Sequence, residues 1–296
     1  MKPKHFAFLA PAIWGSTYLV TTQILPANKP LLAAAVRALP AGLILIIGRP
    51  LPSLHWITKL FVLGALNIGV FFVLLFVAAY RLPGGIVALV GSVQPLIVIA
   101  LSIKLLTQSV TQRQAISAVV GGLGVALLIS LPSTALDPIG LLAAFGATIS
   151  MACGLVLTKK WGRPSNLNLL TFTGWQLFCG GLVIVPFLLI TEPFPSSLTT
   201  INLFGFLYLA IPGSLFAYFV WFAGLEVFAP VAMSLLGFIS PMVALSLGFF
   251  FLNQKLSIAQ MIGAALVIGA IFYSLPKWPK FSQGLSSARQ EAAKSI

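Results

Sequence analysis

Residues 57–80 of the chain read ITKLFVLGALNIGVFFVLLFVAAY and contain one charged residue, Lys59. As an α-helix at 1.5 Å per residue, this run would be about 36 Å long, more than the roughly 30 Å of the hydrocarbon core of a bilayer. The rest of the chain is similar, because 59% of its 296 residues are hydrophobic and 7% are charged. A soluble domain has about 25% charged residues. The sequence therefore predicts an all-α integral membrane protein.

Apolar runs separated by prolines, glycines and charges predict ten transmembrane helices. We expect them at residues 5–24, 31–47, 57–80, 84–105, 113–130, 138–158, 168–190, 201–224, 229–252 and 258–275. The first run has no obvious small-residue cleavage site, so we expect it to remain as a helix and not to be removed as a signal peptide. Short loops leave no room for a soluble domain, and a polar cytoplasmic tail is expected at 277–296.

The basic residues indicate the orientation of the bundle. With the N-terminus in the cytoplasm, 13 of the 17 Lys and Arg residues lie in cytoplasmic segments. The positive-inside rule predicts this distribution for a protein with both termini inside. We therefore expect a multi-pass protein of the plasma membrane, which is the inner membrane in a bacterium, with cytoplasmic N- and C-termini.

The two halves of the chain resemble each other. At an offset of 146 residues, matching positions include Gly91 with Gly237, Pro95 with Pro241 and Gln114 with Gln260, and at a smaller offset of 139 Arg37 matches Gln176. Five helices in each half are an odd number, so the second half enters the membrane from the opposite side. We expect inverted five-helix repeats at 1–131 and 132–276. Such inverted repeats are characteristic of secondary transporters with a binding site near the bilayer midplane.

Several motifs resemble the drug/metabolite transporter superfamily, in particular its ten-helix branch with two EamA repeats and the aromatic amino-acid exporter type. These are Trp14-Gly15-Ser16 in the first helix, Arg37 in the second, and Pro95 and Pro241 in the fourth and ninth. The resemblance covers roughly residues 6–275. It implies export of amino acids, including aromatic ones, or similar small metabolites by alternating access.

This chain departs from the family pattern after the fourth and ninth helices. The family usually has Glu in the motif there, whereas this chain has Gln108 and Gln254. Spanning helices also lack a secure carboxylate, which is the usual carrier of a proton relay. We therefore expect transport without proton coupling.

The residues that we expect to line a substrate cavity are polar or aromatic and lie at membrane depth. On the first helix Trp14, Thr17, Tyr18 and Thr21 share a face, because they are three or four residues apart. Other helices contribute Asn67, Phe71, Ser92, Gln94, Thr148, Trp175, Gln176, Tyr218 and Trp221. Such a set suits an amphiphilic organic solute. Each side chain could alternatively bond to a neighbouring helix or to a carbonyl one turn back.

Two prolines and one arginine have separate expected roles. Pro95 and Pro241 lack the amide proton that would bond to the carbonyl one turn earlier, so with Gly91 and Gly237 they are expected to form hinges. Arg37 lies near the start of the second helix. It could extend along the helix toward the membrane surface or bond to a helix end, or it could pair with a substrate carboxylate.

Other functional classes lack the residues that they need. The net charge of +13 is scattered over short loops, which argues against nucleic acid, and no GxxxxGK[ST] loop is present for a nucleotide-driven motor. Cys153 and Cys179 lie in apolar runs, and His5 and His55 lie near membrane edges, so we expect no metal, no cofactor and no enzymatic activity. A nucleotide-sugar or phosphorylated-metabolite carrier is the main alternative, and a membrane-embedded enzyme a remote one. The expected partners are a small-molecule substrate and the lipid bilayer, with a monomeric protein.

Overall fold

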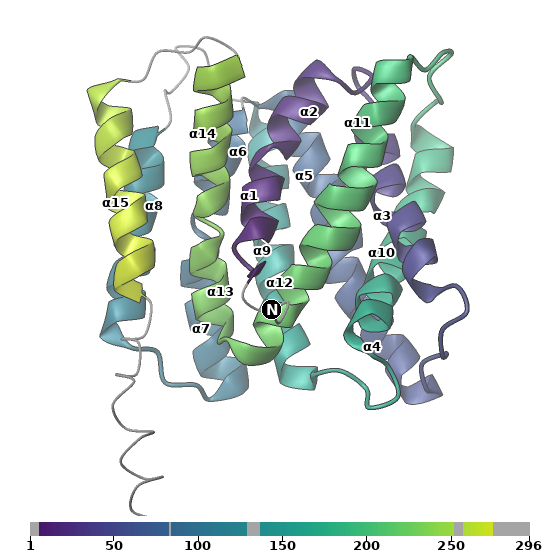
Figure 1. The fold of residues 1–296 in the computed structure, drawn as a ribbon, viewed down its shortest axis with the longest axis horizontal. Helices are drawn as coiled ribbons and strands as arrows, with labels where there is room; N and C mark the ends of the chain where they lie inside the picture. The colour runs from purple at the N-terminus through teal and green to yellow at the C-terminus, as the bar shows by residue number, and fades with distance from the viewer. Residues whose placement is uncertain (1–5, 83, 129–136, 252–256, 275–296) are drawn as a thin grey trace, which may run out of the picture.

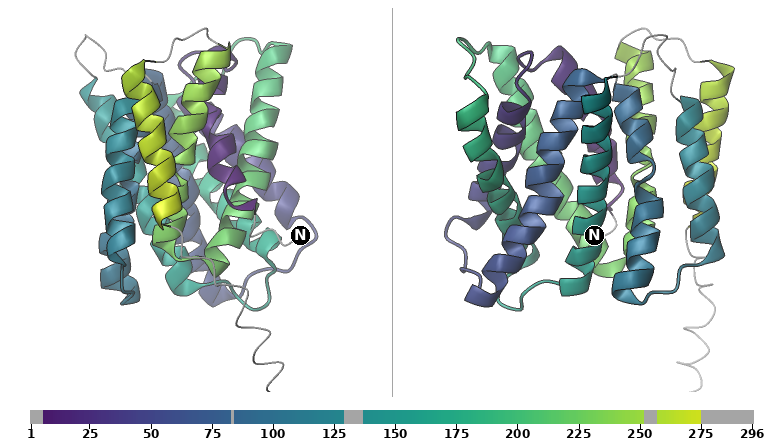
Figure 2. Two further views of the ribbon diagram at one scale, coloured as in Figure 1. Left: turned by 60° about the vertical axis from the view of Figure 1, so that its left-hand side comes forward. Right: turned by 180° about the vertical axis from the view of Figure 1, so that it is seen from behind.

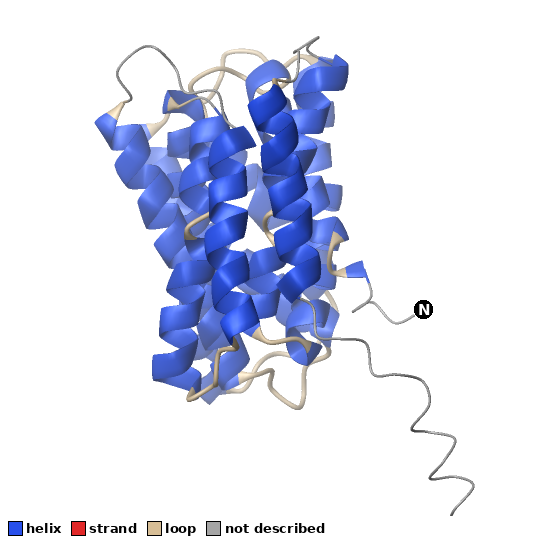
Figure 3. Cartoon of the chain, turned by 90° about the vertical axis from the view of Figure 1, so that its left-hand side faces the viewer, coloured by secondary structure: helices blue, strands red, loops and turns tan. Residues whose placement is uncertain are grey.

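The computed structural model describes residues 6–82, 84–128, 137–251 and 257–274. Within these ranges the secondary structure is helical, with no strand (Figure 3). The expected tail at 277–296 and Gln254 lie outside the described residues.

The described helices form ten segments of one bundle (Figure 1). In chain order they are α1 (Leu9–Gly15) with α2 (Thr17–Gln23); α3 (Pro30–Ile46); α4 (Leu54–Gly64), the π-helix η2 (Ala65–Gly69) and α5 (Val70–Arg81); α6 (Gly84–Gly91) with α7 (Gln94–Leu106); α8 (Gln112–Leu128); α9 (Pro138–Trp161); α10 (Leu169–Thr191); α11 (Thr200–Ala210), the π-helix η3 (Ile211–Phe216) and α12 (Ala217–Val227); α13 (Pro230–Leu236) with α14 (Ile239–Phe251); and α15 (Ile258–Ser274). Each expected helix agrees with one segment to within a few residues. Six segments are long and apolar enough to cross a membrane, and α3, α8 and α15 are shorter apolar helices.

The outside of the bundle is apolar. Leu142, Phe204 and Phe250 expose 73%, 66% and 73% of their surface. Soluble monomers rarely expose large contiguous apolar patches, whereas a lipid-facing surface requires them. The fold is therefore the all-α membrane architecture that the sequence predicts.

Interruptions inside three helices were not predicted. The first helix breaks at Ser16, whose hydroxyl donates to the Ile13 carbonyl at 2.7 Å and lies 2.6 Å from the Tyr208 hydroxyl. The third and eighth helices contain the π-helical turns η2 and η3, which begin at residues 65 and 211. These positions differ by the repeat offset of 146. Because π-turns are rare and are frequent at functional sites, a matched pair marks this level of the bundle.

Helix contacts occur in pairs that exchange the two halves (Figures 1 and 2). The second helix packs against the seventh, α3 on α10, and the fifth against the tenth, α8 on α15. The first and ninth helices pack through α1 and α14, and their repeat equivalents, the sixth and fourth helices, pack through α9 and α7. The third and sixth helices pack through α5 and α9, and their repeat equivalents, the eighth and first helices, pack through α12 and α1.

Close contacts between α3 and α10 show the same exchange. Gly42 approaches the backbone of Phe178, and Gly181 approaches the side chain of Leu39. Both matched pairs, 42 with 181 and 39 with 178, differ by 139 residues, the offset that also links Arg37 to Gln176. Here one position of the first repeat contacts a second position of the second repeat, and the second position of the first repeat contacts the first position of the second repeat. Such a reciprocal contact indicates a two-fold axis. The repeats are thus inverted copies related by an axis in the membrane plane.

A hydroxyl residue followed three residues later by Gln recurs at the start of α8 and of α15, and it has a structural role there. The amide of Thr111 donates to Gln114 Oε1 at 3.0 Å, and the amide of Gln114 donates to the Thr111 hydroxyl at 3.3 Å. Ser257 and Gln260 make the same pair of bonds at 2.8 and 3.2 Å. Each helix therefore begins with a reciprocal capping box, which explains why a hydroxyl residue and Gln recur three residues apart.

Candidate substrate cavity

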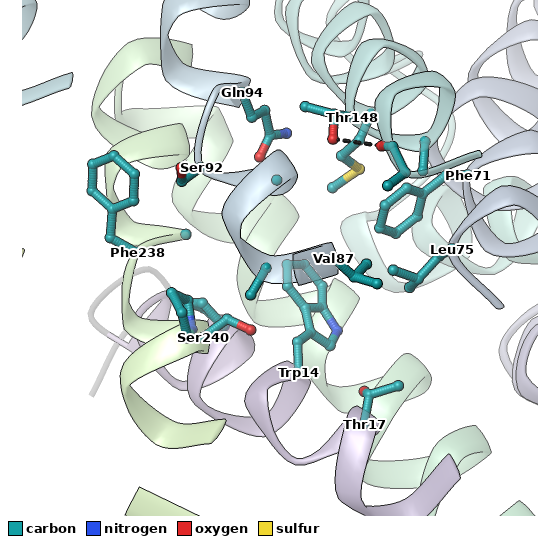
Figure 4. A pocket seen from close by; sticks show the side chains of 18 of the residues that line it. Trp14, Thr17, Phe71, Leu75, Val87, Ser92, Gln94, Thr148, Phe238 and Ser240 are labelled. Carbon is teal, nitrogen blue, oxygen red and sulfur yellow. Dashed lines mark hydrogen bonds between the residues drawn. The ribbon is translucent and has the colours of Figure 1, made fainter. Parts of the chain in front are cut away.

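A cavity of about 130 Å³ lies between the two repeats, beside the breaks in the fourth and ninth helices (Figure 4). The first repeat contributes α1, α2, α3, α5, α6 and α7 to its walls, and the second contributes α9, α12, α13 and α14. The predicted residues that line it are Trp14, Thr17, Tyr18, Arg37, Phe71, Gly91, Ser92, Gln94, Pro95, Thr148, Trp221, Gly237 and Pro241. Whether they contact a substrate stays a prediction.

Aromatic side chains form one wall, with Trp14 at its centre. The Trp14 indole N–H donates to the Gly213 carbonyl in η3 at 3.0 Å. Its ring centroid lies 5.0 Å from that of Tyr218 and 5.1 Å from that of Trp221. Phe71 of α5 also lines the cavity (Figure 4). Trp14 is thus held in one orientation by a π-turn, and this wall offers planar apolar surface to a ligand.

Hydroxyl groups on three helices face the same space. Thr148 donates to the Ala144 carbonyl at 2.8 Å, and Ser92 donates to the Leu89 carbonyl at 2.6 Å. Ser234 does the same within α13. Each hydroxyl proton is therefore used within its own helix, and the oxygen keeps lone pairs that can accept a bond from a ligand.

Arg37 is buried and reaches the cavity from α3. Its Nε donates to Ser214 Oγ at 3.1 Å and its Nη2 to the Gly213 carbonyl at 3.1 Å, so it is tied to η3. The guanidinium carbon lies 4.5 Å from the centroid of the Phe72 ring. The expectation that Arg37 extends to the membrane surface is wrong, because the π-turn opposite α3 supplies acceptors at membrane depth.

The hinge prolines do not interrupt continuous helices. Helix four stops at Gly91 and restarts at Gln94, and Pro95 is the second residue of the new helix. Helix nine restarts at Ile239, so Pro241 also lies in a first turn. There the missing amide proton costs little, because first-turn amides have no intrahelical partner. The expected free carbonyl at Gly237 is also wrong, because this oxygen accepts a bond from the Ser240 amide at 3.0 Å.

Five residues predicted for the cavity lie outside its lining: Thr21, Asn67, Trp175, Gln176 and Tyr218. Three of them form an interhelix network. Asn67 Nδ2 donates to Thr158 Oγ1 at 3.0 Å and to Gln176 Oε1 at 2.8 Å, and the Tyr218 hydroxyl donates to the Asn67 carbonyl at 3.2 Å. Within the described residues Asn67 Oδ1 and Gln176 Nε2 have no partner, so the network satisfies these groups in part, and their polarity at membrane depth reflects packing between the repeats.

Trp175 and Thr21 are displaced for other reasons. Trp175 packs edge-on against Phe178, with ring centroids 5.9 Å apart, in a separate apolar cluster with Leu60 and Phe172. Thr21 is buried on α2 one turn beyond Thr17 and Tyr18, which are the residues of this helix that line the cavity.

Sequence reasoning also missed apolar lining residues, among them Pro11, Leu75, Met151 and Phe238. They carry no polar signal at membrane depth. Helical spacing could have found three of them, since Pro11 lies three residues before Trp14, Leu75 four residues after Phe71 and Met151 three residues after Thr148.

The described carboxylates all lie at helix ends. Asp137 caps α9, and its pKa is held below the usual range by the bond from the Gly140 amide and, after it, by Arg81 at 3.0 Å. Glu192 accepts bonds from two amides at the start of α3 at 2.8 and 2.9 Å. Glu226 pairs with Arg163 at 2.7 Å. None of the carboxylates in the part of the chain that the structure describes lines the cavity.

An inverted pair of five-helix repeats around a central cavity defines a membrane transporter. The chain belongs to the EamA-like transporter family, whose model matches residues 4–130 and 138–275. The match covers each of the two repeats, which agrees with the drug/metabolite transporter resemblance of the sequence.

Curated relatives and a solved structure agree with this assignment. The chain is 66% identical to Protein PecM of Dickeya dadantii over 271 residues, which are 92% of this chain and 91% of that protein. It is 26% identical to a probable amino-acid metabolite efflux pump of Salmonella typhimurium over 93% of this chain and 95% of that protein. A crystal structure with 18% identity superimposes with a TM-score of 0.75, covering 92% of this chain and 96% of the other, and supports the fold.

Proposed function

We propose that this transporter exports amino acids, aromatic ones included, or similar small metabolites. The observation that carries the proposal is the cavity between the repeats, where the indoles of Trp14 and Trp221 face a space that also holds Arg37, Gln94 and hydroxyl groups. An amphiphilic solute with a planar apolar part and a polar head matches this lining. The relative from Salmonella typhimurium whose name refers to amino-acid metabolite efflux supports the same solute class.

Alternating access is supported by two ties at opposite ends of the bundle. The Tyr80 hydroxyl at the end of helix three donates to the Pro26 carbonyl in the loop between helices one and two, at 2.9 Å. Glu226 at the end of helix eight pairs with Arg163 in the loop between helices six and seven. Positions 80 and 226 differ by the repeat offset of 146. Breaking one tie while the other holds would expose the cavity to one side at a time.

Transport without proton coupling is the mode that the charges favour. A proton relay needs titratable groups along the path, and the described carboxylates lie at helix ends instead. We infer that export follows the gradient of the substrate. We further propose a monomer in the plasma membrane with both termini in the cytoplasm, as the distribution of basic residues indicates.

The alternatives fit the lining less well. A carrier of nucleotide sugars or phosphorylated metabolites needs several basic groups around the phosphate, and Arg37 is the one basic residue among the described residues that line the cavity. A membrane-embedded enzyme needs a cluster of nucleophile, base or metal ligands. The described residues contain no group of three or more His, Cys, Asp or Glu side chains that could hold a metal ion.

Counterflow in liposomes tests the proposal. Purified protein is reconstituted into vesicles loaded with millimolar unlabelled L-phenylalanine, L-tryptophan, L-leucine, a hexose or a nucleotide sugar, and uptake of the same radiolabelled solute is followed. We expect labelled amino acid to accumulate transiently and hexose not to accumulate. Accumulation of hexose or of a nucleotide sugar, with none of the amino acids, would reject the proposed solute class.

A further inference from the structure

Arg37 has hydrogen-bonding capacity that the protein does not use. A guanidinium carries five N–H donors. In the structure three bonds are formed, to Ser214 Oγ, to the Gly213 carbonyl and, at 3.4 Å, to Thr17 Oγ1. Arg37 is 2% exposed and lines the cavity, so the remaining donors can be met by a molecule inside the cavity.

No described carboxylate neutralises this arginine. Asp137, Glu192 and Glu226 are engaged elsewhere at helix ends. A buried charge without a counter-ion is unfavourable in a membrane protein, and the ring of Phe72 and three neutral oxygens compensate it only in part. An anionic group of a ligand would complete the compensation.

The fold itself does not require a charge at this position. The equivalent residue of the second repeat is Gln176, which bonds to Asn67 of the matching π-turn η2 at 2.8 Å. Both residues therefore tie a helix to a π-turn, and the neutral amide does so away from the cavity. Arg37 therefore carries a charge that the tie itself does not need, and it lies in the repeat whose tie faces the cavity.

Two more donors in the cavity wall have no partner. The Trp221 indole N–H and the Gln94 side-chain N–H groups are buried and make no hydrogen bond within the described residues. Both residues line the same cavity as Arg37 (Figure 4 shows Gln94). Unpartnered buried donors are costly, and a ligand with acceptor oxygens would satisfy them.

We propose that Arg37, with Trp221 and Gln94, selects substrates that carry a carboxylate, and that the guanidinium binds it. This inference rests on the proposed function and names the feature that the cavity recognises. The aromatic wall around Trp14 receives the apolar part of the substrate. The oxygens of Thr148 and Ser92 can accept bonds from an amino group, because their own protons are used within their helices.

Matched pairs of ligands with and without the carboxylate test the inference. Binding to the purified transporter is measured calorimetrically with L-phenylalanine, L-leucine and phenylacetate, each beside the amide in which an uncharged carboxamide replaces the carboxylate. Wild type should bind at least one carboxylate about 10- to 100-fold more tightly than its amide, the range of charge-assisted hydrogen bonds. Arg37→Gln, which copies the residue of the second repeat, should remove this preference, and Arg37→Lys should retain part of it.

The control is Arg49→Gln, the same substitution at an exposed arginine outside the cavity, and it should keep the wild-type preference. Melting temperatures confirm that each variant is folded. Should Arg37→Gln fail to fold, Arg37→Lys and the wild-type ligand pairs still decide the matter. Equal binding of acid and amide by wild type would overturn the inference and leave export of small metabolites standing. A preference that survives in Arg37→Gln would overturn it as well, and absence of binding by every acid would reject both proposals.

Discussion

Replacing Pro95 by alanine should slow transport by stiffening the fourth helix. In the structure this helix stops at Gly91 and restarts at Gln94, and Pro95 has no amide proton to offer the Gly91 carbonyl. Alanine at position 95 supplies that proton and allows one bond across the break. If the break bends during alternating access, the added bond favours whichever conformation is straighter.

The size of the effect follows from the position of the proline. A proline in a helix interior costs about 3 kcal/mol, but Pro95 lies in a first turn, where the cost is smaller. One backbone bond gained contributes a net 0.5–1.5 kcal/mol or about a 2- to 13-fold shift of a balanced equilibrium. At Pro241 the Gly237 carbonyl already accepts a bond from the Ser240 amide, so the gain is smaller. We therefore expect Pro95→Ala to slow flux more than Pro241→Ala, and the double variant to be slowest.

Counterflow rates at equal reconstituted protein measure this effect, beside equilibrium binding of the same solute. Pro186→Ala is the matched control, because Pro186 lies inside α10 on an exposed face and does not line the cavity. Binding should stay within about threefold of wild type in all variants. Wild-type flux in the double variant would show that the prolines are packing features and would refute the hinge.

Three further predictions concern proton coupling, helix packing and the tie between Glu226 and Arg163. Net efflux of L-phenylalanine from loaded vesicles should proceed at the same rate with and without an imposed pH gradient, since no described carboxylate lines the cavity; net flux that depends on the pH gradient would reveal a proton carrier. Gly154→Ala should lower stability by about 1–3 kcal/mol, because the new methyl group overlaps the Asn67 side chain, and an unchanged thermal midpoint would argue against this contact. Glu226→Gln removes the partly exposed pair with Arg163, so stability should change by less than about 1 kcal/mol while thiol labelling increases for a cysteine at position 155, one turn beyond the cavity-lining Met151 on α9; unaltered labelling would mean that the tie does not restrain this end of the bundle.

The class and the repeat could be predicted from sequence because they depend on long averages. Apolar runs locate the ten helices, and the recurrence of Gly91 and Pro95 at Gly237 and Pro241 reveals the second repeat. The π-turns could not be predicted in this way. They insert one residue without interrupting the long apolar run, and the residues that they contain, such as Asn67 in η2 or Pro212 and Gly213 in η3, are also tolerated in ordinary spanning helices.

The site was predictable only in part, because a polar residue at membrane depth has two explanations. Gln94 and Asn67 carry the same side-chain amide, so the sequence does not distinguish their roles. In the structure Gln94 lines the cavity with an unpartnered nitrogen, whereas Asn67 bonds to Thr158 and Gln176. The partners of Asn67 lie 91 and 109 residues away in sequence, and only the packing of the repeats shows them. Arg37 is similar, since its acceptor in η3 exists because the eighth helix has a π-turn there.

Accessibility of the cavity from both sides of the membrane tests the central claim most directly. Thr148 is buried in the cavity wall, so Thr148→Cys, with Cys153 and Cys179 replaced by alanine, places one thiol on the path. Right-side-out and inside-out vesicles are treated with a membrane-impermeant maleimide, with and without excess L-phenylalanine. We expect labelling from each side and protection by the solute on both. A thiol that reacts from one side only, under every substrate condition, would contradict alternating access through this cavity.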